Sequence, residues 1–129
     1  MNIVDSCGWL EYIANGSNAA FFEKALADEA HLLMPPLVVF EVIRRLKVLG
    51  QDFAIDPTIT VMRRVQRADL SADQLVEAAL ATHGHKLALA DAIIWQTAQT
   101  YHALLYTQDA DLQGLPGVVY QAKPAKTRG

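Results

Sequence analysis

The sequence predicts an α/β fold in which a central, mostly parallel sheet is flanked by helices. Short apolar runs of strand length alternate along the chain with longer segments of helical spacing. The chain has 129 residues, of which 52% are hydrophobic and 19% charged, as expected for one globular domain rather than two. The longest apolar run, residues 32–40, contains two prolines and is far shorter than the roughly 20 residues of a membrane helix.

The chain opens with a strand followed by two helices. Residues 2–4 are a short apolar, β-branched run that fits a buried strand. Apolar residues then recur at helical spacing over 8–13, before the helix-breaking pair at 15–16. A second helix is expected over 18–26, with Asn18 as its cap.

A second strand and a third helix follow. Residues 32–34 are apolar and end at Pro35, which begins a pair of prolines. Because proline is tolerated in the first turn of a helix, the next helix is expected over 37–49, closed by Gly50.

The middle of the chain predicts two further helices with a strand between them. Pro57 is expected to open a helix that carries basic residues as far as Arg67, and residues 68–70 are a candidate strand. Ser71 can cap the next helix, which is expected to end at Thr82.

The last third predicts one helix and two strands. The helix is expected over 87–102, and the apolar run 103–107 is expected to form a strand. A Pro-Gly turn at 116–117 then precedes a short strand at 118–120. Sites in open α/β sheets lie beyond the carboxyl ends of the strands, so the residues that follow each strand are the first candidates for function.

Charge and cysteine content exclude several classes of protein. A single cysteine, Cys7, excludes an intrachain disulfide and a cysteine-rich zinc site. The formal charge of −3 excludes nucleic-acid binding through net charge alone. The N-terminus has no basic stretch before its apolar residues and reaches Asp5 at once, so we expect no secretory signal and a cytoplasmic protein.

Two carboxylates follow expected strands. Asp5 comes directly after the first strand, and Asp109 follows the strand that ends at Thr107. Both therefore belong to the edge of the sheet that holds ligands. Asp is also common after strands as a turn former or helix cap, which is the alternative for each residue alone.

Two further carboxylates lie in otherwise apolar helical segments. Asp91 has only apolar neighbours at helical spacing, so its charge needs either a cation or the free backbone amides of a helix start. Glu41 lies within LVVFEVIRRL, where it either pairs with Arg44 and Arg45 one turn later or points toward a less exposed site.

Together the four acids favour a hard divalent cation. Like charges that converge in the folded chain repel one another unless a cation lies between them. Oxygen-only ligands are the preference of Mg²⁺, for which Mn²⁺ can substitute, whereas zinc prefers nitrogen or sulfur. His83 and His85 are the rival ligand pair, with a solvated helix end as the alternative. No nucleophile elbow of a serine hydrolase is present in the sequence.

Four segments together carry a resemblance to a known family. They are IVDSCGWLEY, PPLVVFEVIRRL, LALADAIIWQTA and LLYTQDADL, in this order. With them the chain resembles the PIN domain, specifically the VapC-type ribonuclease toxins of toxin–antitoxin pairs. The resemblance implies a single PIN-like domain over residues 1–122, followed by a polar, basic tail at 123–129.

The resemblance also implies a site and an activity. The family's metal-binding acids correspond here to Asp5, Glu41, Asp91 and Asp109, and the implied reaction is Mg²⁺-dependent endoribonuclease cleavage that leaves a 5′-phosphate. From the residues alone, Glu41 is either a metal ligand or the group that orients or deprotonates the attacking water. The polar residues expected around the acids are Ser6, Thr107 and Asp111; Asp111 is either an outer or alternative ligand or a turn cap.

The chain departs from the family pattern at two positions near these acids. Ala88 stands where many relatives have Ser or Thr three residues before the third acid, and Cys7 stands where Asn or Ser is frequent. Neither change removes a carboxylate, so both concern the positioning of Asp91 and the choice of substrate.

Basic residues are the candidates for contact with RNA. Of the 14 acidic residues, the four expected at the metal leave ten against 11 Lys and Arg. The basic residues cluster in two segments, with solvated helix surface as the alternative for each. They are Arg44, Arg45, Lys47, Arg63, Arg64 and Arg67.

The resemblance implies two protein partners, an antitoxin and a second copy of the toxin. The antitoxin's C-terminal segment is expected in an apolar groove. The candidate aromatic residues are Trp9, Tyr12, Phe21 and Phe22, with core packing as the alternative.

Two other functions remain open at this stage. One is a receiver-like phosphoacceptor domain, which also groups acids at strand ends around Mg²⁺. The other is a catalytically silent PIN-like binding module.

Overall fold

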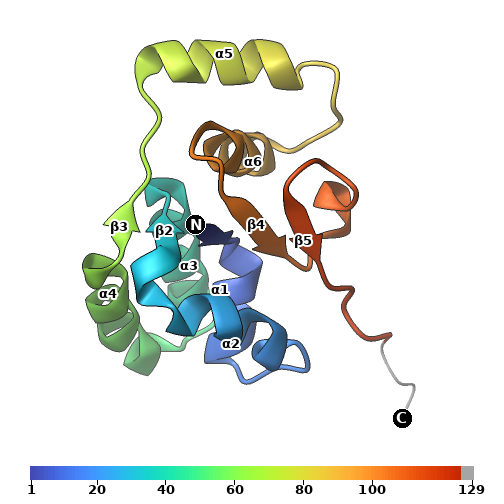
Figure 1. The fold of residues 1–129 in the computed structure, drawn as a ribbon. Coiled ribbons are helices and arrows are strands. Elements are labelled where there is room, and N and C mark those ends of the chain that lie inside the picture. Colours follow the sequence, from blue (N-terminus) through green and yellow to red (C-terminus); the bar gives the residue numbers. More distant parts are fainter. Residues whose placement is uncertain (126–129) are drawn as a thin grey trace.

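A computed structural model describes residues 1–125, in which a parallel sheet lies among six helices (Figure 1). Residues 126–129 of the expected tail lie outside the described residues. Five strands form the sheet, in the order β3-β2-β1-β4-β5, and every pairing is parallel. The strands are β1 (Asn2–Val4), β2 (Leu32–Met34), β3 (Gln66–Arg67), β4 (Leu104–Thr107) and β5 (Val118–Tyr120). The expected α/β class with a parallel sheet is confirmed.

The helices connect the strands in the way that parallel pairing requires. They are α1 (Ser6–Ile13), α2 (Ala19–Ala27), α3 (Pro36–Val48), α4 (Ile55–Arg64), α5 (Ala72–Thr82) and α6 (Leu89–Thr100). Three short 3₁₀ helices are η1 (Glu29–His31), η2 (Asp52–Ala54) and η3 (Ala110–Leu112). In Figure 1, α5 lies across the top of the molecule, over α6 and away from the sheet.

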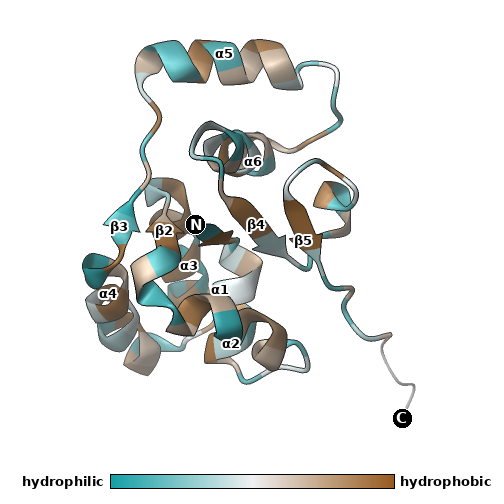
Figure 2. Ribbon diagram, in the orientation of Figure 1, coloured by the Kyte–Doolittle hydropathy of each residue, from teal (hydrophilic) through white to brown (hydrophobic). Residues whose placement is uncertain are grey.

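Apolar strands and helix faces form the core. Figure 2 shows β2, β4 and β5 in brown, the colour of hydrophobic residues. Ile3, Leu32 and Leu105 of the three central strands are fully buried, together with Phe22 of α2 and Ile94 of α6. None of the helices within residues 1–125 is both long enough and apolar enough to cross a membrane.

The third strand lies two residues earlier than expected. Val65 leaves α4 with an extended backbone, and Gln66–Arg67 pair with the end of β2. The backbone amide of Ala68 makes the last contact, donating to the carbonyl of Met34. The prediction of a strand at 68–70 is therefore wrong, and Arg67 belongs to β3 rather than to a helix.

Helix α6 is shorter than expected at both ends. It begins at Leu89, because Ala88 has an extended backbone, and it ends at Thr100, before His102 adopts a left-handed φ of 52°. Asp91 therefore lies in the first turn of α6, near the free backbone amides of the helix start. Helix α4 begins at Ile55, two residues before Pro57, which lies in the first turn where its missing N–H costs nothing.

A close approach between α1, α2 and β1 depends on Gly8. A Cβ atom at this position would lie 2.6 Å from the ring of Phe22 and 2.6 Å from a methyl group of Val4. We expect Gly8→Ala to lower the free energy of unfolding by about 1–3 kcal/mol through overpacking, measured by urea denaturation. Gly84→Ala is the matched control, because nothing lies within 4 Å of the added atom there. A Gly8→Ala protein as stable as the wild type would contradict this packing.

Candidate metal centre

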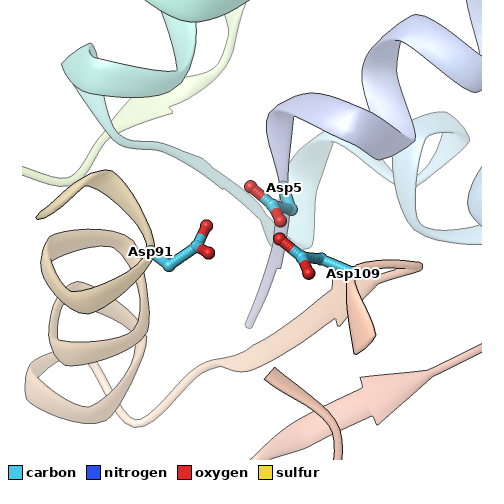
Figure 3. A group of neighbouring side chains, drawn as sticks. All are labelled: Asp5, Asp91 and Asp109. Carbon is cyan, nitrogen blue, oxygen red and sulfur yellow. The ribbon is translucent and has the colours of Figure 1, made fainter. Parts of the chain in front are cut away.

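Adjacent central strands bring the first two acids together. Strands β1 and β4 pair in parallel, and Asp5 and Asp109 come after their carboxyl ends. The backbone amide of Asp5 donates to the carbonyl of Tyr106, which continues the ladder to the edge of the sheet. Asp5 and Asp109 therefore lie side by side, as Figure 3 shows.

Asp5 is the most buried and most constrained of the acids, with a side chain only 3% exposed. It caps α1, where its Oδ1 accepts from the backbone amide of Ser6 at 2.8 Å. Its Oδ2 accepts from the Thr107 hydroxyl at 2.9 Å. Burial raises the pKa of Asp5, while these two hydrogen bonds act in the opposite direction. The helix cap that the sequence offered as the alternative for Asp5 is therefore confirmed, and its role at a metal site stays a prediction.

Thr107 holds both strand-end acids in place. It is fully buried, and its Oγ1 accepts from the backbone amide of Asp109 at 3.0 Å while the hydroxyl donates to Asp5. Asp109 in turn caps η3 by accepting from the amide of Asp111 at 2.9 Å. One buried hydroxyl therefore fixes the spacing between the two carboxylates.

Asp91 reaches the same place from α6. Its carboxylate points toward those of Asp5 and Asp109 (Figure 3). Each of the three offers one oxygen, and these oxygens lie within 4.8 Å of one another. Burial, followed by the charges of Asp109 and Asp5, raises the pKa of Asp91 to about 7. Three carboxylates at this spacing repel one another, and this repulsion adds to the effect of burial on the pKa of Asp91.

Glu41 contributes from α3 but lies outside this group of three. Its Oε1 is buried and has no hydrogen-bond partner among the described residues. Burial and the charge of Asp5 raise the pKa of Glu41, and the Ser6 hydroxyl acts against that shift. The expected ion pair with Arg44 or Arg45 does not appear among residues 1–125. An unpaired buried carboxylate oxygen is costly, so its presence points to a ligand.

The residues present fit a divalent cation. Opposite ligands of one Mg²⁺ lie about 4.2 Å apart, close to the spacing of the three aspartate oxygens. The donor set is oxygen only, and the orphaned Oε1 of Glu41 is a further acceptor nearby. This chemistry matches Mg²⁺ or Mn²⁺ better than zinc.

Cys7 makes contacts with the site that the sequence analysis did not predict, although it noted this residue as a departure from the family pattern. Its Sγ lies 3.5 Å from Oδ2 of Asp5 and 3.5 Å from Oγ1 of Thr107. Burial raises the pKa of the thiol to about 12, so it stays protonated and acts as a donor. Its position two residues after Asp5, in the first turn of α1, was the available signal.

Ser6 and Asp111 are the other polar residues that were expected around the acids, and each makes fewer hydrogen bonds with them than Thr107 does. Ser6 contributes its backbone amide to Asp5, and its hydroxyl lowers the pKa of Glu41 against the effect of burial. Asp111 is exposed, and its contribution within the described residues is the backbone amide that binds Asp109. Its carboxylate is not part of the group of three.

Half of the candidate RNA-binding residues already have acidic partners. Lys47 binds Asp52 at 2.7 Å, Arg64 binds Glu29 at 2.7 Å and Arg67 binds Asp69 at 2.9 Å, all at exposed positions. Exposed pairs of this kind are worth little and are easily exchanged for another anion. Arg44, Arg45 and Arg63 are exposed as well.

Comparison with known proteins agrees with the fold. The chain is similar in structure to a toxin–antitoxin complex from Klebsiella pneumoniae, with a TM-score of 0.74 and 24% identity over 92% of this chain and 96% of that one. It is also similar to DNA-bound VapBC from Salmonella typhimurium, with a TM-score of 0.67 and 14% identity over 95% and 98% of the two chains. VapBC2 from Rickettsia felis, bound to a promoter DNA fragment, gives a TM-score of 0.68 and 14% identity over 95% and 98%.

No curated protein sequence matches the chain. The family model of the PIN domain matches residues 3–118, nearly the whole described chain. This match excludes the receiver-like alternative, because it covers all four acids and the strands β2, β3 and β4 in full, and it takes in part of β1 and β5. The chain belongs to the PIN domain family.

Proposed function

We propose that this protein is a Mg²⁺-dependent endoribonuclease and the toxin of a toxin–antitoxin pair in the cytoplasm. The observation that carries the proposal is the meeting of three carboxylate oxygens within 4.8 Å at the carboxyl edge of a PIN-domain sheet. The toxin–antitoxin complexes among its structural neighbours support the biological role.

The four acids have two different roles in the proposed site. Asp5, Asp91 and Asp109 hold the cation, which, when bound, lowers the pKa of a water and neutralises charge on the phosphate. Glu41 lies outside the group of three and has a free buried oxygen, so we assign it the orientation and deprotonation of the attacking water. Thr107, Ser6 and Cys7 keep Asp5 in its orientation.

The proposed reaction is hydrolysis without a protein nucleophile. The water oxygen forms a bond to phosphorus, and its proton passes to Glu41. The bond from phosphorus to the 3′ oxygen breaks, and that oxygen takes a proton from solvent. The products are a 5′-phosphate and a 3′-hydroxyl.

Chelation tests the metal-dependent reaction directly. We expect the purified protein to cleave single-stranded RNA with Mg²⁺ or Mn²⁺, to lose cleavage in EDTA and to regain it when excess metal is added. Gel analysis of a labelled transcript measures the products. Cleavage that continues in EDTA would contradict the assignment, and no cleavage with either metal would favour a silent PIN-like module.

An apolar groove between α1, α2 and α4 is the proposed antitoxin site. It has a volume of about 450 Å³ and includes Trp9, Tyr12, Leu26, Phe53 and Val61. Tyr12 is 44% exposed and Phe53 80% exposed, which is unusual for large apolar side chains. Of the other expected aromatics, Phe22 is fully buried and Phe21 packs on it with ring centroids 4.9 Å apart. Of the four candidates, Tyr12 is exposed at the groove, and Trp9 lines it from the core with only 4% exposure, whereas Phe21 and Phe22 pack on each other away from it.

We expect Phe53→Ser to weaken binding of the antitoxin encoded by a neighbouring reading frame by about tenfold or more, the usual effect of losing a central aromatic contact. Isothermal titration calorimetry measures the affinity. Val48→Ser is the control, because Val48 is 67% exposed on α3 but does not line the groove. Equal affinities for both variants would place the antitoxin elsewhere.

The proposed homodimer has apolar surface available on α5. Leu75, Val76 and Leu80 are all exposed on this helix, which buries only Ala78. Exposed apolar surface of this kind is typical of protein interfaces. We therefore propose α5 as part of the contact between two copies.

A further inference from the structure

A second and larger groove lies between α3 and α4, separate from the proposed antitoxin site. Its volume is about 1000 Å³. Its walls are apolar, with Val39 and Ile43 from α3 and Ile59 and Met62 from α4. Its rim is basic, formed by Arg44, Lys47, Arg63 and Arg67. None of the lining residues is acidic within the described part of the chain.

This groove lies along the same sheet edge as the four acids. Met34 and Arg67 are the last residues of β2 and β3, they pair in register, and both line the groove. Asp5 follows β1, the strand next to β2, so β3 lies two strand spacings away, about 10 Å. The groove and the strand-end acids therefore lie at the same edge of the sheet, and none of the four acids lines the groove itself.

Helix α3 links the groove to the site directly. Glu41 faces the acids, and Arg44 follows one helical turn later on the rim of the groove. Arg44 and Arg63 have no carboxylate partner among residues 1–125, whereas Lys47 and Arg67 bind exposed aspartates. Two free guanidinium groups beside a hydrolytic centre match the geometry of phosphate oxygens.

Phe40 supplies a flat surface at the groove. Its side chain is 59% exposed, and the guanidinium carbon of Arg44 lies 5.7 Å from the centre of its ring. An exposed aromatic ring next to arginine is the usual support for an unpaired base, because every base has a flat apolar face. The apolar walls suit the base, and the basic rim suits the backbone that carries it.

We infer that this groove binds an unpaired nucleotide flanking the cleaved bond, with its base against Phe40 and its phosphates at Arg44 and Arg63. The inference rests on the proposed ribonuclease function and adds to it the place where one nucleotide of the strand binds. An acidic protein segment would match the same charges. The exposed ring of Phe40 and the position of the groove at the same sheet edge as the acids favour the strand that is being cleaved.

The test measures binding and cleavage with the same oligonucleotides. Binding is measured by fluorescence anisotropy in EDTA on an Asp91→Asn background, so that the RNA stays intact. A set of single-stranded RNAs carries one abasic position, moved stepwise along both sides of the cleavage point. We expect one sensitive position on one side only, and weak binding of the matched duplex.

Phe40→Ala is expected to weaken binding about 5- to 150-fold, the effect of losing one base–aromatic stack, and to remove the abasic sensitivity. Phe40→Tyr keeps the ring and is expected to restore both. Val48→Ala is the matched control, an exposed apolar residue of α3 outside the groove. Arg44→Gln and Arg63→Gln are each expected to reduce the slope of log affinity against log salt by about 0.7, and Lys24→Gln, on exposed α2 surface, to leave it unchanged.

The possible results distinguish an error in the nucleotide-binding inference from an error in the proposed ribonuclease function. If the wild type cleaves RNA and Phe40→Ala binds and cleaves as well as the wild type, the inference is wrong and the ribonuclease function stands. If Phe40→Ala loses only the antitoxin, the groove is a protein site and the inference is again wrong. If the wild type neither binds nor cleaves RNA, the proposed function fails together with the inference.

Discussion

Asp5→Asn is expected to abolish RNA cleavage while the fold stays intact. The substitution removes a charge that contributes to the raised pKa of both Asp91 and Glu41. Asparagine keeps the oxygen that caps α1, so the helix start is preserved. We expect the cleavage rate to fall at least about 100-fold, the scale of losing one group that stabilises developing charge.

The same variant is expected to be more stable than the wild type in the absence of metal. Removing one of three clustered charges relieves their repulsion, so the melting temperature in EDTA should rise. Added Mg²⁺ should then stabilise the wild type and have little effect on Asp5→Asn, measured by thermal unfolding. Asp73→Asn, at an exposed position on α5, is the control and should cleave normally. A fully active Asp5→Asn protein would rule out the metal centre.

The metal-free protein is expected to become less stable as pH rises from about 4 to 7. Asp91 has a pKa of about 7 in the folded chain against an ordinary value of 3.8, so the folded state binds more protons than the unfolded state in this window. Stability falls with pH wherever the folded state holds the extra proton, and the loss is complete above the folded pKa. The raised pKa values of Asp5 and Glu41 act in the same direction.

Magnesium should reverse this dependence, because a cation replaces the proton as the partner of the carboxylates. We expect a lower melting temperature at pH 8 than at pH 5.5 in EDTA, and a larger stabilisation by Mg²⁺ at pH 8. Asp91→Asn should flatten the profile in EDTA. A metal-free protein whose melting temperature rises steadily from pH 5.5 to pH 8 would show that the carboxylates do not share one pocket.

Local sequence signals predicted most of the elements. Ser71 caps α5 as expected, and the pair of prolines places the start of α3 within one residue. The strands at 2–4, 32–34 and 118–120 agree residue for residue. These elements are specified by neighbours in the chain, through capping, turn formation and apolar spacing.

Features that depend on distant residues were harder to predict. The two-residue strand β3 exists because Met34 and its neighbour offer a free edge, which no pattern near residue 66 reveals. The partner of Arg64 is Glu29, 35 residues away in the sequence. The placement of Glu41 outside the group of three depends on how α3 packs, and the contact of Cys7 with Thr107 spans 100 positions.

The location of Thr107 and Asp109 near the end of the chain has a consequence for biosynthesis. The pocket takes acids from four separate segments, and β4, which lies beside β1 in the middle of the sheet, is the fourth of its five strands to be made. A nascent chain that stops before residue 107 lacks both the hydroxyl that anchors Asp5 and one of the clustered aspartates. The ribosome must therefore add at least 109 residues before the three aspartates can meet.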